Sequence, residues 1–201
     1  MDYFVAPGAD VDSRARIGRG SKIWHLAQVR EEAQLGENCI IGRGAYIGTG
    51  VQMGHNCKVQ NYALVYEPAV IADGVFIGPA AVLTNDTYPR AVNPDGSLKG
   101  GDDWEHVGVT IGEGAAIGAR AVCVAPVTIG AWATIGSGAV VVKDVPAFAL
   151  MVGVPARQIG WVGKSGHPLV QAADGADTTW VCPVTGARYQ QVGETLQEVE
   201  R

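Results

Sequence analysis

Apolar residues recur every six positions over most of this chain. From Val5 to Leu83 every sixth residue is aliphatic, and the residue four positions after each is small, mostly alanine. The same two series resume between Ile111 and Val141. A period of six fits neither an α-helix nor simple strand alternation. It predicts a short strand followed by a corner, with three such units closing a triangular coil of about 18 residues.

The fold predicted from this repeat is all-β, a left-handed parallel β-helix of six to seven coils. The aliphatic side chains point inward and stack on their equivalents one coil away, about 4.8 Å along the axis. Glycine, at 28 of 201 residues, often follows the aliphatic residue, and we expect it at corners with unusual φ and ψ. Cys39, Cys57 and Cys123 fall in inward slots, and no C-x-x-C pair indicates a zinc site or a disulfide framework.

Charge and hydropathy exclude several classes of partner. The net charge is −5, and no basic run is interleaved with aromatic residues, which argues against nucleic acid. The N-terminus lacks the basic and apolar regions of a signal peptide. No apolar stretch reaches the ~18 residues of a membrane span. We therefore expect a cytoplasmic protein with neither a nucleic-acid nor a membrane partner.

The repeat is interrupted between Leu83 and Ile111, where the six-residue register is lost. The intervening sequence is polar and contains several prolines and glycines. It predicts a loop over residues 85–107 that protrudes from the β-helix. Long excursions from a rigid solenoid often carry function, although a tolerated surface insertion remains open.

Beyond Val141 the repeat ends, and the chain divides into three expected parts. The β-helix domain covers residues 1–160, and residues 161–177 are expected as a linker. Residues 178–201 contain short apolar stretches separated by turn residues, which predict a small β appendage. Too small to fold well alone, it is expected to dock on the β-helix or on a neighbouring subunit.

Three segments carry a resemblance to known enzymes: LTNDTYPR (residues 83–90), GVPARQIGW (153–161) and CPVTGARY (182–189). With the repeats, they resemble the hexapeptide-repeat acyltransferases over about residues 1–160. The whole chain is similar to the UDP-2-acetamido-3-amino-2,3-dideoxy-glucuronate N-acetyltransferases of O-antigen and lipopolysaccharide biosynthesis. The resemblance implies acetyl-CoA as co-substrate, a UDP-amino sugar as acceptor and a homotrimer with active sites between subunits.

Amide formation needs an oriented neutral amine, an oxyanion donor and a proton acceptor. Many hexapeptide acyltransferases use a loop histidine as base, but here Asn85 opens the loop, and an amide is no base. Asn85 is expected to orient the sugar amine, while the departing CoA thiolate, with a pKa near ~8.5, takes the proton. An 18-residue coil places Glu67 beneath Asn85, where it is the second catalytic candidate or a solvated corner carboxylate. His106, at the far end of the loop, is a spare candidate base.

Further residues are assigned to binding, each with plain surface exposure as the competing interpretation. The expected substrate-binding residues are Arg30, Tyr66, Asp86, Tyr88, Arg90 and His25. The two arginines suit a sugar carboxylate or diphosphate, and His25 is expected to face a neighbour's loop across the trimer cleft. By resemblance, acetyl-CoA is expected at Gly118, Gly136, Lys143 and Arg157.

Three alternative functions remain open. A γ-class carbonic anhydrase shares the fold but needs zinc ligands in an H-x4-H pattern, which this chain lacks, so no metal is expected. A non-catalytic β-helix scaffold would need neither the loop nor the GVPAR ending. An acetyltransferase for another nucleotide sugar, such as a dTDP-3-amino-6-deoxyhexose, would not need arginines in the sugar site.

Overall fold

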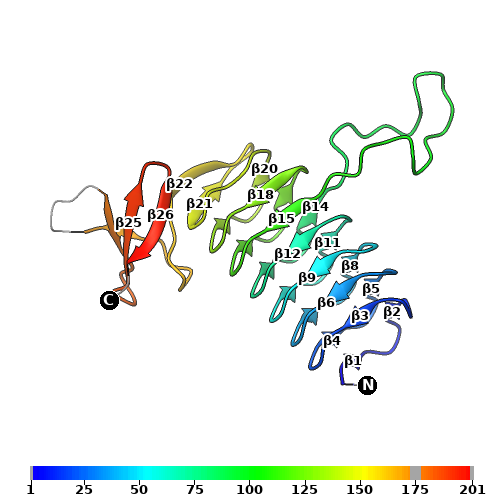
Figure 1. The fold of residues 1–201 in the computed structure, drawn as a ribbon, viewed down its shortest axis with the longest axis horizontal. Helices are drawn as coiled ribbons and strands as arrows, with labels where there is room; N and C mark the ends of the chain where they lie inside the picture. The colour runs from blue at the N-terminus through cyan, green and yellow to red at the C-terminus, as the bar shows by residue number, and fades with distance from the viewer. Residues whose placement is uncertain (1, 173–177, 200–201) are drawn as a thin grey trace.

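The computed structural model describes residues 2–172 and 178–199 and is all-β, without a helix in these ranges. Residues 4–161 form a parallel β-solenoid of about 8 turns with three faces, and a small antiparallel sheet follows at the C-terminal end (Figure 1). The predicted all-β parallel β-helix is therefore confirmed. No helix of the described residues has the length and apolarity to cross a membrane.

Each face of the solenoid is one sheet, built from strands of two to five residues. Sheet A contains β1 (Phe4–Val5), β4 (Lys22–Ile23), β7 (Ile40–Ile41), β10 (Lys58–Val59), β13 (Phe76–Ile77), β16 (Ala116–Ile117), β19 (Thr134–Ile135), β21 (Ala149–Val152) and β22 (Arg157–Trp161). Sheet B contains β2 (Asp10–Val11), β5 (Gln28–Val29), β8 (Tyr46–Ile47), β11 (Leu64–Val65), β14 (Val82–Leu83), β17 (Val122–Cys123) and β20 (Val140–Val141). Sheet C contains β3 (Arg16–Ile17), β6 (Gln34–Leu35), β9 (Gln52–Met53), β12 (Val70–Ile71), β15 (Val109–Ile111) and β18 (Val127–Ile129).

The predicted inward positions form the core. Val65 pairs with Ile47 below and Leu83 above, 18 residues away on each side, and all three are fully buried. The alanines and cysteines of the small series are also buried from Ala27 onward, whereas Ala9 and Ala15 in the first coil are partly buried. Like side chains thus stack on like along the axis, and each coil buries its apolar surface against its neighbours.

Glycine directly follows the aliphatic residues because the next coil leaves no room for a side chain there, and not because of the backbone conformation. The expectation of unusual φ was wrong for these positions, because φ is positive elsewhere in the corners, as at Gly44 (63°) and Tyr62 (60°). A Cβ on Gly118 would lie 2.5 Å from the backbone nitrogen of Ser137 in the next coil. Only glycine lets the coils approach this closely at the start of a corner.

The solenoid continues beyond the last clear hexad, which accounts for about one more turn than the repeats predict. Strand β21 pairs in parallel with β19, aligning Met151 with Ile135, and Val145 forms a parallel bridge with Ile129. Strand β22 then folds back antiparallel on β21 and ends the sheet. The GVPAR segment forms the turn between these two strands.

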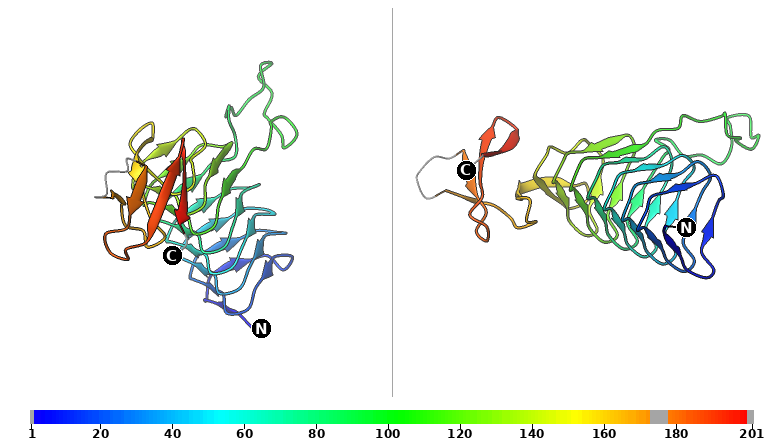
Figure 2. Two further views of the ribbon diagram at one scale, coloured as in Figure 1. Left: turned by 60° about the vertical axis from the view of Figure 1, so that its left-hand side comes forward. Right: turned by 60° about the horizontal axis from the view of Figure 1, so that its bottom comes forward.

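The C-terminal sheet contains β23 (Val170–Gln171), β24 (Thr179–Val181), β25 (Arg188–Val192) and β26 (Thr195–Val199). This sheet packs at the end of the solenoid opposite the N-terminus (Figure 2). There the rings of Phe148 and Tyr189 pack edge to face, with their centroids 5.4 Å apart. Strand β23 and Trp161 lie in the segment expected as a linker, of which residues 173–177 lie outside the described residues. Residues 200–201 of the expected appendage also lie outside them.

Candidate active site

The protruding loop leaves the solenoid at the corner between sheets B and C, which we call the loop corner. It begins after β14 and ends before β15, and the Val107 N–H donates to the Asn85 carbonyl at 3.2 Å where the two ends meet. The loop projects sideways from the coils, away from the body of the solenoid (Figures 1 and 2). The coils beneath it therefore supply the side chains nearest to its root.

Arg30 and Glu31 form an ion pair on the loop corner. Arg30 Nε and Nη2 donate to the Glu31 carboxylate, both at 2.7 Å, and Nη1 donates to the Tyr46 hydroxyl at 3.4 Å. Thr49, one coil above, donates to Glu31 Oε1 at 3.2 Å. The bonds from Arg30 lower the pKa of Glu31 to about 2. The charge of Arg30 is thus already balanced, and an anionic ligand there would share the guanidinium with Glu31.

Glu67 is the unusual residue of this corner. Its Oε2 atom is buried and accepts no hydrogen bond within the described residues. The carboxylate lies over Gly48, in space that a Cβ at that position would occupy. Tyr46 and Tyr66 flank it as a tilted ring pair with centroids 5.2 Å apart, and burial raises the pKa of Tyr46. Such an orphaned acceptor is costly unless a ligand satisfies it.

The root of the loop is held by the Thr84 hydroxyl and by backbone hydrogen bonds, so its attachment does not use the Asn85 side chain. Thr84 Oγ1 accepts from the Ala125 N–H at 2.9 Å and ties the root to the following coil. Within the described residues the Asn85 amide group makes no hydrogen bond. The register of β11 with β14 places Glu67 one coil beneath Asn85, as the 18-residue coil predicts. An amide donor and a carboxylate acceptor thus lie on successive coils of one corner.

Of the remaining loop candidates, Asp86 is half-buried and the others are exposed. Asp86 Oδ1 accepts from the Tyr88 N–H at 2.7 Å, which leaves the second oxygen open. Tyr88 is 82% exposed, and Arg90 contacts only the Pro89 carbonyl, at 2.8 Å. His106 stacks on Trp104, with ring centroids 3.8 Å apart, and bonds to the Gly101 carbonyl through Nε2.

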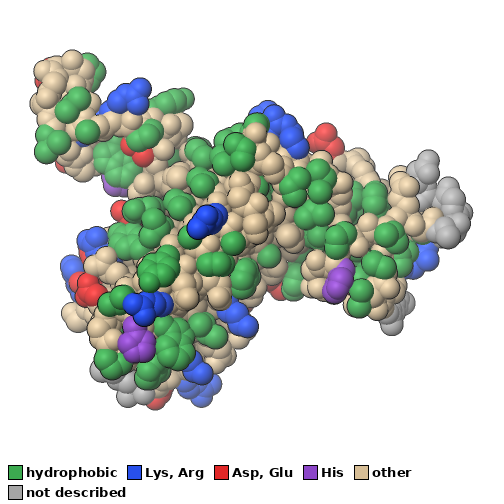
Figure 3. All heavy atoms as spheres, turned by 180° about the vertical axis from the view of Figure 1, so that it is seen from behind, with side chains coloured by type: hydrophobic (Ala, Val, Ile, Leu, Met, Phe, Trp, Pro, Cys, Tyr) green, Lys and Arg blue, Asp and Glu red, His purple; other side chains and the backbone are tan. Residues whose placement is uncertain are grey.

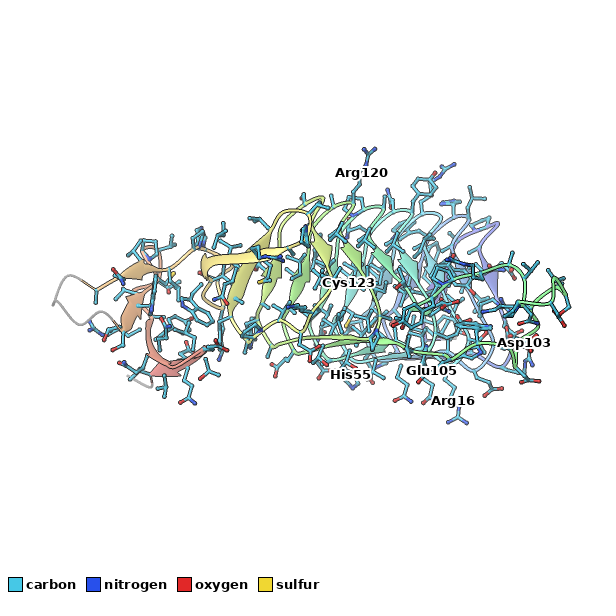
Figure 4. The ribbon with its side chains drawn as sticks, turned by 90° about the horizontal axis from the view of Figure 1, so that it is seen from above. Arg16, His55, Asp103, Glu105, Arg120 and Cys123 are labelled. Atoms are coloured by element: carbon cyan, nitrogen blue, oxygen red, sulfur yellow. The ribbon has the colours of Figure 1, made fainter. Side chains whose placement is uncertain are left out.

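Other candidates lie away from the loop corner. His25, Gly118 and Gly136 follow strands of sheet A, so they lie at the corner between sheets A and B. Figure 4 shows this separation, because Arg120 of that corner extends from the edge opposite the loop residue Glu105. Within one chain, His25 therefore does not join Asn85 and Glu67.

The co-substrate candidates are not gathered into one cluster. The glycines have a structural reason, since a Cβ on Gly136 would lie 2.9 Å from the Val152 side chain. Lys143 follows β20 and is exposed, whereas Arg157 begins β22 and donates to the Ala156 carbonyl at 2.9 Å. On the face shown in Figure 3, Lys and Arg side chains are scattered among hydrophobic and neutral ones.

Sequence reasoning missed Tyr46 and Glu31, which complete the loop corner. Tyr46 points outward from β8, where the repeat alone says only that a residue is exposed. Glu31 lies 36 residues, or two 18-residue coils, before Glu67, so the same coil arithmetic that placed Glu67 beneath Asn85 also reaches Glu31. No group of three or more His, Cys, Asp or Glu side chains in the described residues is placed to hold a metal.

Comparison with known families agrees with this architecture. Residues 14–49 match the bacterial transferase hexapeptide model of six repeats, and residues 108–143 match the hexapeptide repeat of succinyl-transferase. Two stretches of the solenoid therefore match hexapeptide repeats of the kind described in transferases. The two matches lie on either side of the protruding loop, which neither model covers.

The hexapeptide-repeat chain is also similar to parts of longer proteins. The bifunctional protein GlmU of Chelativorans sp. (strain BNC1) is 38% identical over 156 residues, which are 78% of this chain and 29% of that protein. GlmU of Synechococcus sp. (strain RCC307) is 27% identical over 166 residues, 81% of this chain and 36% of that protein. The chain spans about a third of the length of these curated relatives.

A solved acyltransferase structure shares the fold. LpxA of Bacteroides fragilis 9343, a UDP-N-acetylglucosamine acyltransferase, superimposes with a TM-score of 0.64 at 18% identity, covering 80% of this chain and 61% of its own. A mutant perosamine N-acetyltransferase of Caulobacter crescentus, in complex with CoA and GDP-perosamine, gives a TM-score of 0.44 at 27% identity, with 78% and 57% coverage.

Proposed function

We propose that this chain transfers an acetyl group from acetyl-CoA to the 3-amino group of a UDP-linked 2-acetamido-3-amino-2,3-dideoxy-glucuronic acid. The reaction belongs to O-antigen and lipopolysaccharide sugar synthesis in the cytoplasm. The matches to transferase hexapeptide repeats support a transferase. The segments at residues 83–90, 153–161 and 182–189 support the narrower substrate by resemblance.

The buried, unpartnered oxygen of Glu67 carries the proposal. A carboxylate without a hydrogen-bond donor loses its hydration without compensation. An amine or a hydroxyl of the acceptor sugar supplies the missing donor. Because Glu67 lies one coil beneath Asn85 at the root of the loop, a sugar held there has its amine within the reach of both residues.

The chemistry then follows from the groups present. The neutral amine attacks the thioester carbonyl, the C–S bond breaks, and the new amide forms. Asn85 orients the amine, since its side chain is not committed to the protein. The proton passes from the ammonium intermediate to the leaving thiolate, whose conjugate acid has a pKa near ~8.5. His106 is not needed as a base and remains bonded to Gly101 within the loop.

The other assigned residues bind the ends of the two substrates. Arg30, Arg90 and Asp86 contact the polar groups of the sugar nucleotide, and Tyr66 and Tyr88 contact its rings. For acetyl-CoA, the backbone at Gly118 and Gly136 bonds to the pantetheine arm, and Lys143 and Arg157 meet the phosphates.

A homotrimer brings these two sets together. In one chain the corner between sheets A and B is a different edge of the triangular coil from the loop corner. A neighbouring copy that presents its A–B corner to this loop places its His25 and its acetyl-CoA residues beside Asn85 and Glu67. The proposed active sites therefore lie between subunits.

An acceptor without a carboxylate is the second candidate, and one observation favours it. Glu31 already neutralises Arg30, so the loop corner holds less free positive charge than the sequence suggests. A dTDP-3-amino-6-deoxyhexose would suit such a site. A scaffold without catalysis is the third reading, and it predicts no binding of acetyl-CoA.

The deciding experiment measures thiol release from acetyl-CoA against a panel of nucleotide 3-amino sugars with and without the C6 carboxylate. We expect the highest kcat/KM with the UDP-linked uronic acid. Preference for the 6-deoxy sugar would replace the substrate but keep the reaction. If no amino sugar causes thiol release and calorimetry detects no binding of acetyl-CoA, the proposed reaction is wrong and the non-catalytic scaffold is the remaining interpretation.

A further inference from the structure

The protruding loop has an ordered conformation that is stabilised by its own hydrogen bonds. Val92 and Leu98 form an antiparallel bridge, and the Asn93 N–H donates to the Ser97 carbonyl at 2.8 Å. Asp103 Oδ2 accepts from the Gly100 N–H at 2.7 Å and from Asn93 Nδ2 at 3.3 Å. These bonds hold two passes of the loop against each other without an apolar core, so the loop keeps a shape of its own.

Between these passes lies a cavity of about 150 Å³, beside the root at Asn85. Its walls are Asp86, Thr87, Tyr88, Lys99, Trp104 and Glu105. Two of the six are aromatic, one is a cation, and two are carboxylates. The cavity is thus suited to a small planar ring with polar edges and an anionic substituent, not to an aliphatic ligand.

Two polar groups of this cavity, those of Lys99 and Trp104, have no hydrogen-bond or ion-pair partner within the described residues, whereas Asp86 and Thr87 each make one hydrogen bond within the fold. Within the described residues, Lys99 Nζ has no carboxylate within ion-pair distance, and the Trp104 indole N–H donates no hydrogen bond. His106 covers one side of the Trp104 ring, which fixes the indole in place. The loop thereby presents a positioned aromatic ring and a free cation within one small space.

We infer that this cavity binds the single-ring base of a pyrimidine nucleoside diphosphate, stacked on Trp104, with Lys99 meeting the adjoining phosphates. The inference rests on the proposed function and adds Trp104 and Lys99 to the acceptor site. Stacking suits any base face, but a volume of about 150 Å³ favours one ring over a fused purine. The sugar, joined to the diphosphate, then extends from the loop toward its root at Asn85.

The test measures UDP binding by titration calorimetry, because UDP alone requires no acetyl transfer. Relative to the unmodified chain, Trp104→Ala is expected to weaken UDP binding by about ten-fold or more, and Trp104→Phe to restore most of it. Lys99→Gln is expected to weaken binding by about five-fold and to reduce its salt dependence. Lys58→Gln, an exposed lysine on sheet A, is the matched control and should bind UDP normally.

Steady-state kinetics separates recognition from a collapsed loop. Trp104→Ala and Lys99→Gln should raise the KM for the nucleotide sugar while kcat and the KM for acetyl-CoA stay unchanged. A fall in kcat with unchanged UDP affinity would mean that Trp104 only supports the loop, which overturns the inference. UDP binding that is unaffected by both variants, or weaker than GDP binding, would overturn it as well.

The outcomes also distinguish this inference from the proposed function. Binding of UDP that depends on Trp104, in a chain that acetylates no amino sugar, would keep the nucleotide cavity and remove the proposed reaction. If the chain transfers acetyl groups but both variants leave the KM for the nucleotide sugar unchanged, the proposed reaction stands and the proposed nucleotide-binding role of the cavity is wrong.

Discussion

The inside of the solenoid and the loop corner use the same 18-residue stacking with opposite results. Inside the solenoid, Val65 lies between Ile47 and Leu83, and each of these buried aliphatic side chains packs against another aliphatic side chain. At the loop corner, stacking places Thr49 over Glu31, and the Glu67 carboxylate over Gly48 with one oxygen unpartnered. The columns of like side chains inside the solenoid thus supply stability. At the loop corner the stacked residues differ from coil to coil, and within the described residues Glu67 Oε2 and the Asn85 amide have no hydrogen-bond partner.

The largest effect we expect is a loss of stability inside the solenoid. Ile71→Ala removes a side chain that is 2% exposed, and we expect it to lower the free energy of unfolding by about 2–5 kcal/mol. Val70→Ala, its neighbour on β12 that is 43% exposed, should cost less than about 1 kcal/mol. Urea unfolding followed by circular dichroism measures both. Equal losses would show that the outer face of sheet C is covered in solution.

The second-largest effect is expected at the loop corner, where a substitution should lower activity without lowering stability. Asn85→Ala should lower kcat/KM for acetyl transfer by about 10–100-fold, because an unbound amide side chain is removed while the backbone bond to Val107 remains. Its free energy of unfolding should change by less than about 0.5 kcal/mol.

A second asparagine provides the control for this experiment. Asn56, at the corner between sheets C and A, has a positive φ of 58°, a conformation that alanine tolerates less well. Asn56→Ala should therefore lose stability and keep its activity per folded protein. If Asn85→Ala retains full kcat/KM, the orienting role of Asn85 is wrong.

The two regions also differ in how far the sequence predicts them. The inner columns follow from the period of six alone, since aliphatic and small residues recur in phase and only one coil geometry buries both. The predicted 18-residue register holds for β11 and β14 up to Val65 beneath Leu83, two residues before Glu67 and Asn85. The glycines after the aliphatic residues were predicted for the wrong reason, because the crowding at Gly118 comes from the next coil and not from φ.

Contacts between outward side chains did not follow from the repeat. The pairing of Arg30 with Glu31 depends on how two adjacent corner side chains turn, and the period says only that both are outside. The interior of the loop has no period, so the cavity between Tyr88 and Trp104 depends on hydrogen bonds between distant residues.

A smaller effect would test the unpartnered carboxylate directly. Glu67→Gln replaces a carboxyl group with one buried, unpartnered oxygen by an amide of nearly the same shape, so we expect the free energy of unfolding to stay the same or to rise by up to about 1 kcal/mol. The KM for the acceptor should rise several-fold, because the amide accepts less strongly from an amine. Thermal unfolding and acceptor titration measure the two quantities. A destabilised variant with a normal KM would mean that Glu67 serves the fold.

The smallest effect concerns the ion pair beside it. Hydrogen bonds from Arg30 lower the pKa of Glu31 from an ordinary 4.5 to about 2. Because the folded pKa is lowered, the stabilising contribution of Glu31 is present above pH 4.5 and is lost as the pH falls through about 2. Both side chains are partly exposed, so the change in stability should be small.

Carboxyl-carbon NMR measures this titration directly. In the unmodified chain Glu31 should remain ionised at pH 3, whereas Arg30→Gln should return its pKa toward 4.5. An unchanged low pKa in Arg30→Gln would assign the effect to Thr49 and the backbone instead. If Arg30 does hold Glu31, a carboxylate on the acceptor must compete with Glu31 for the guanidinium. Glu31→Gln should then lower the KM for acceptors that carry the C6 carboxylate and leave the KM for 6-deoxy acceptors unchanged.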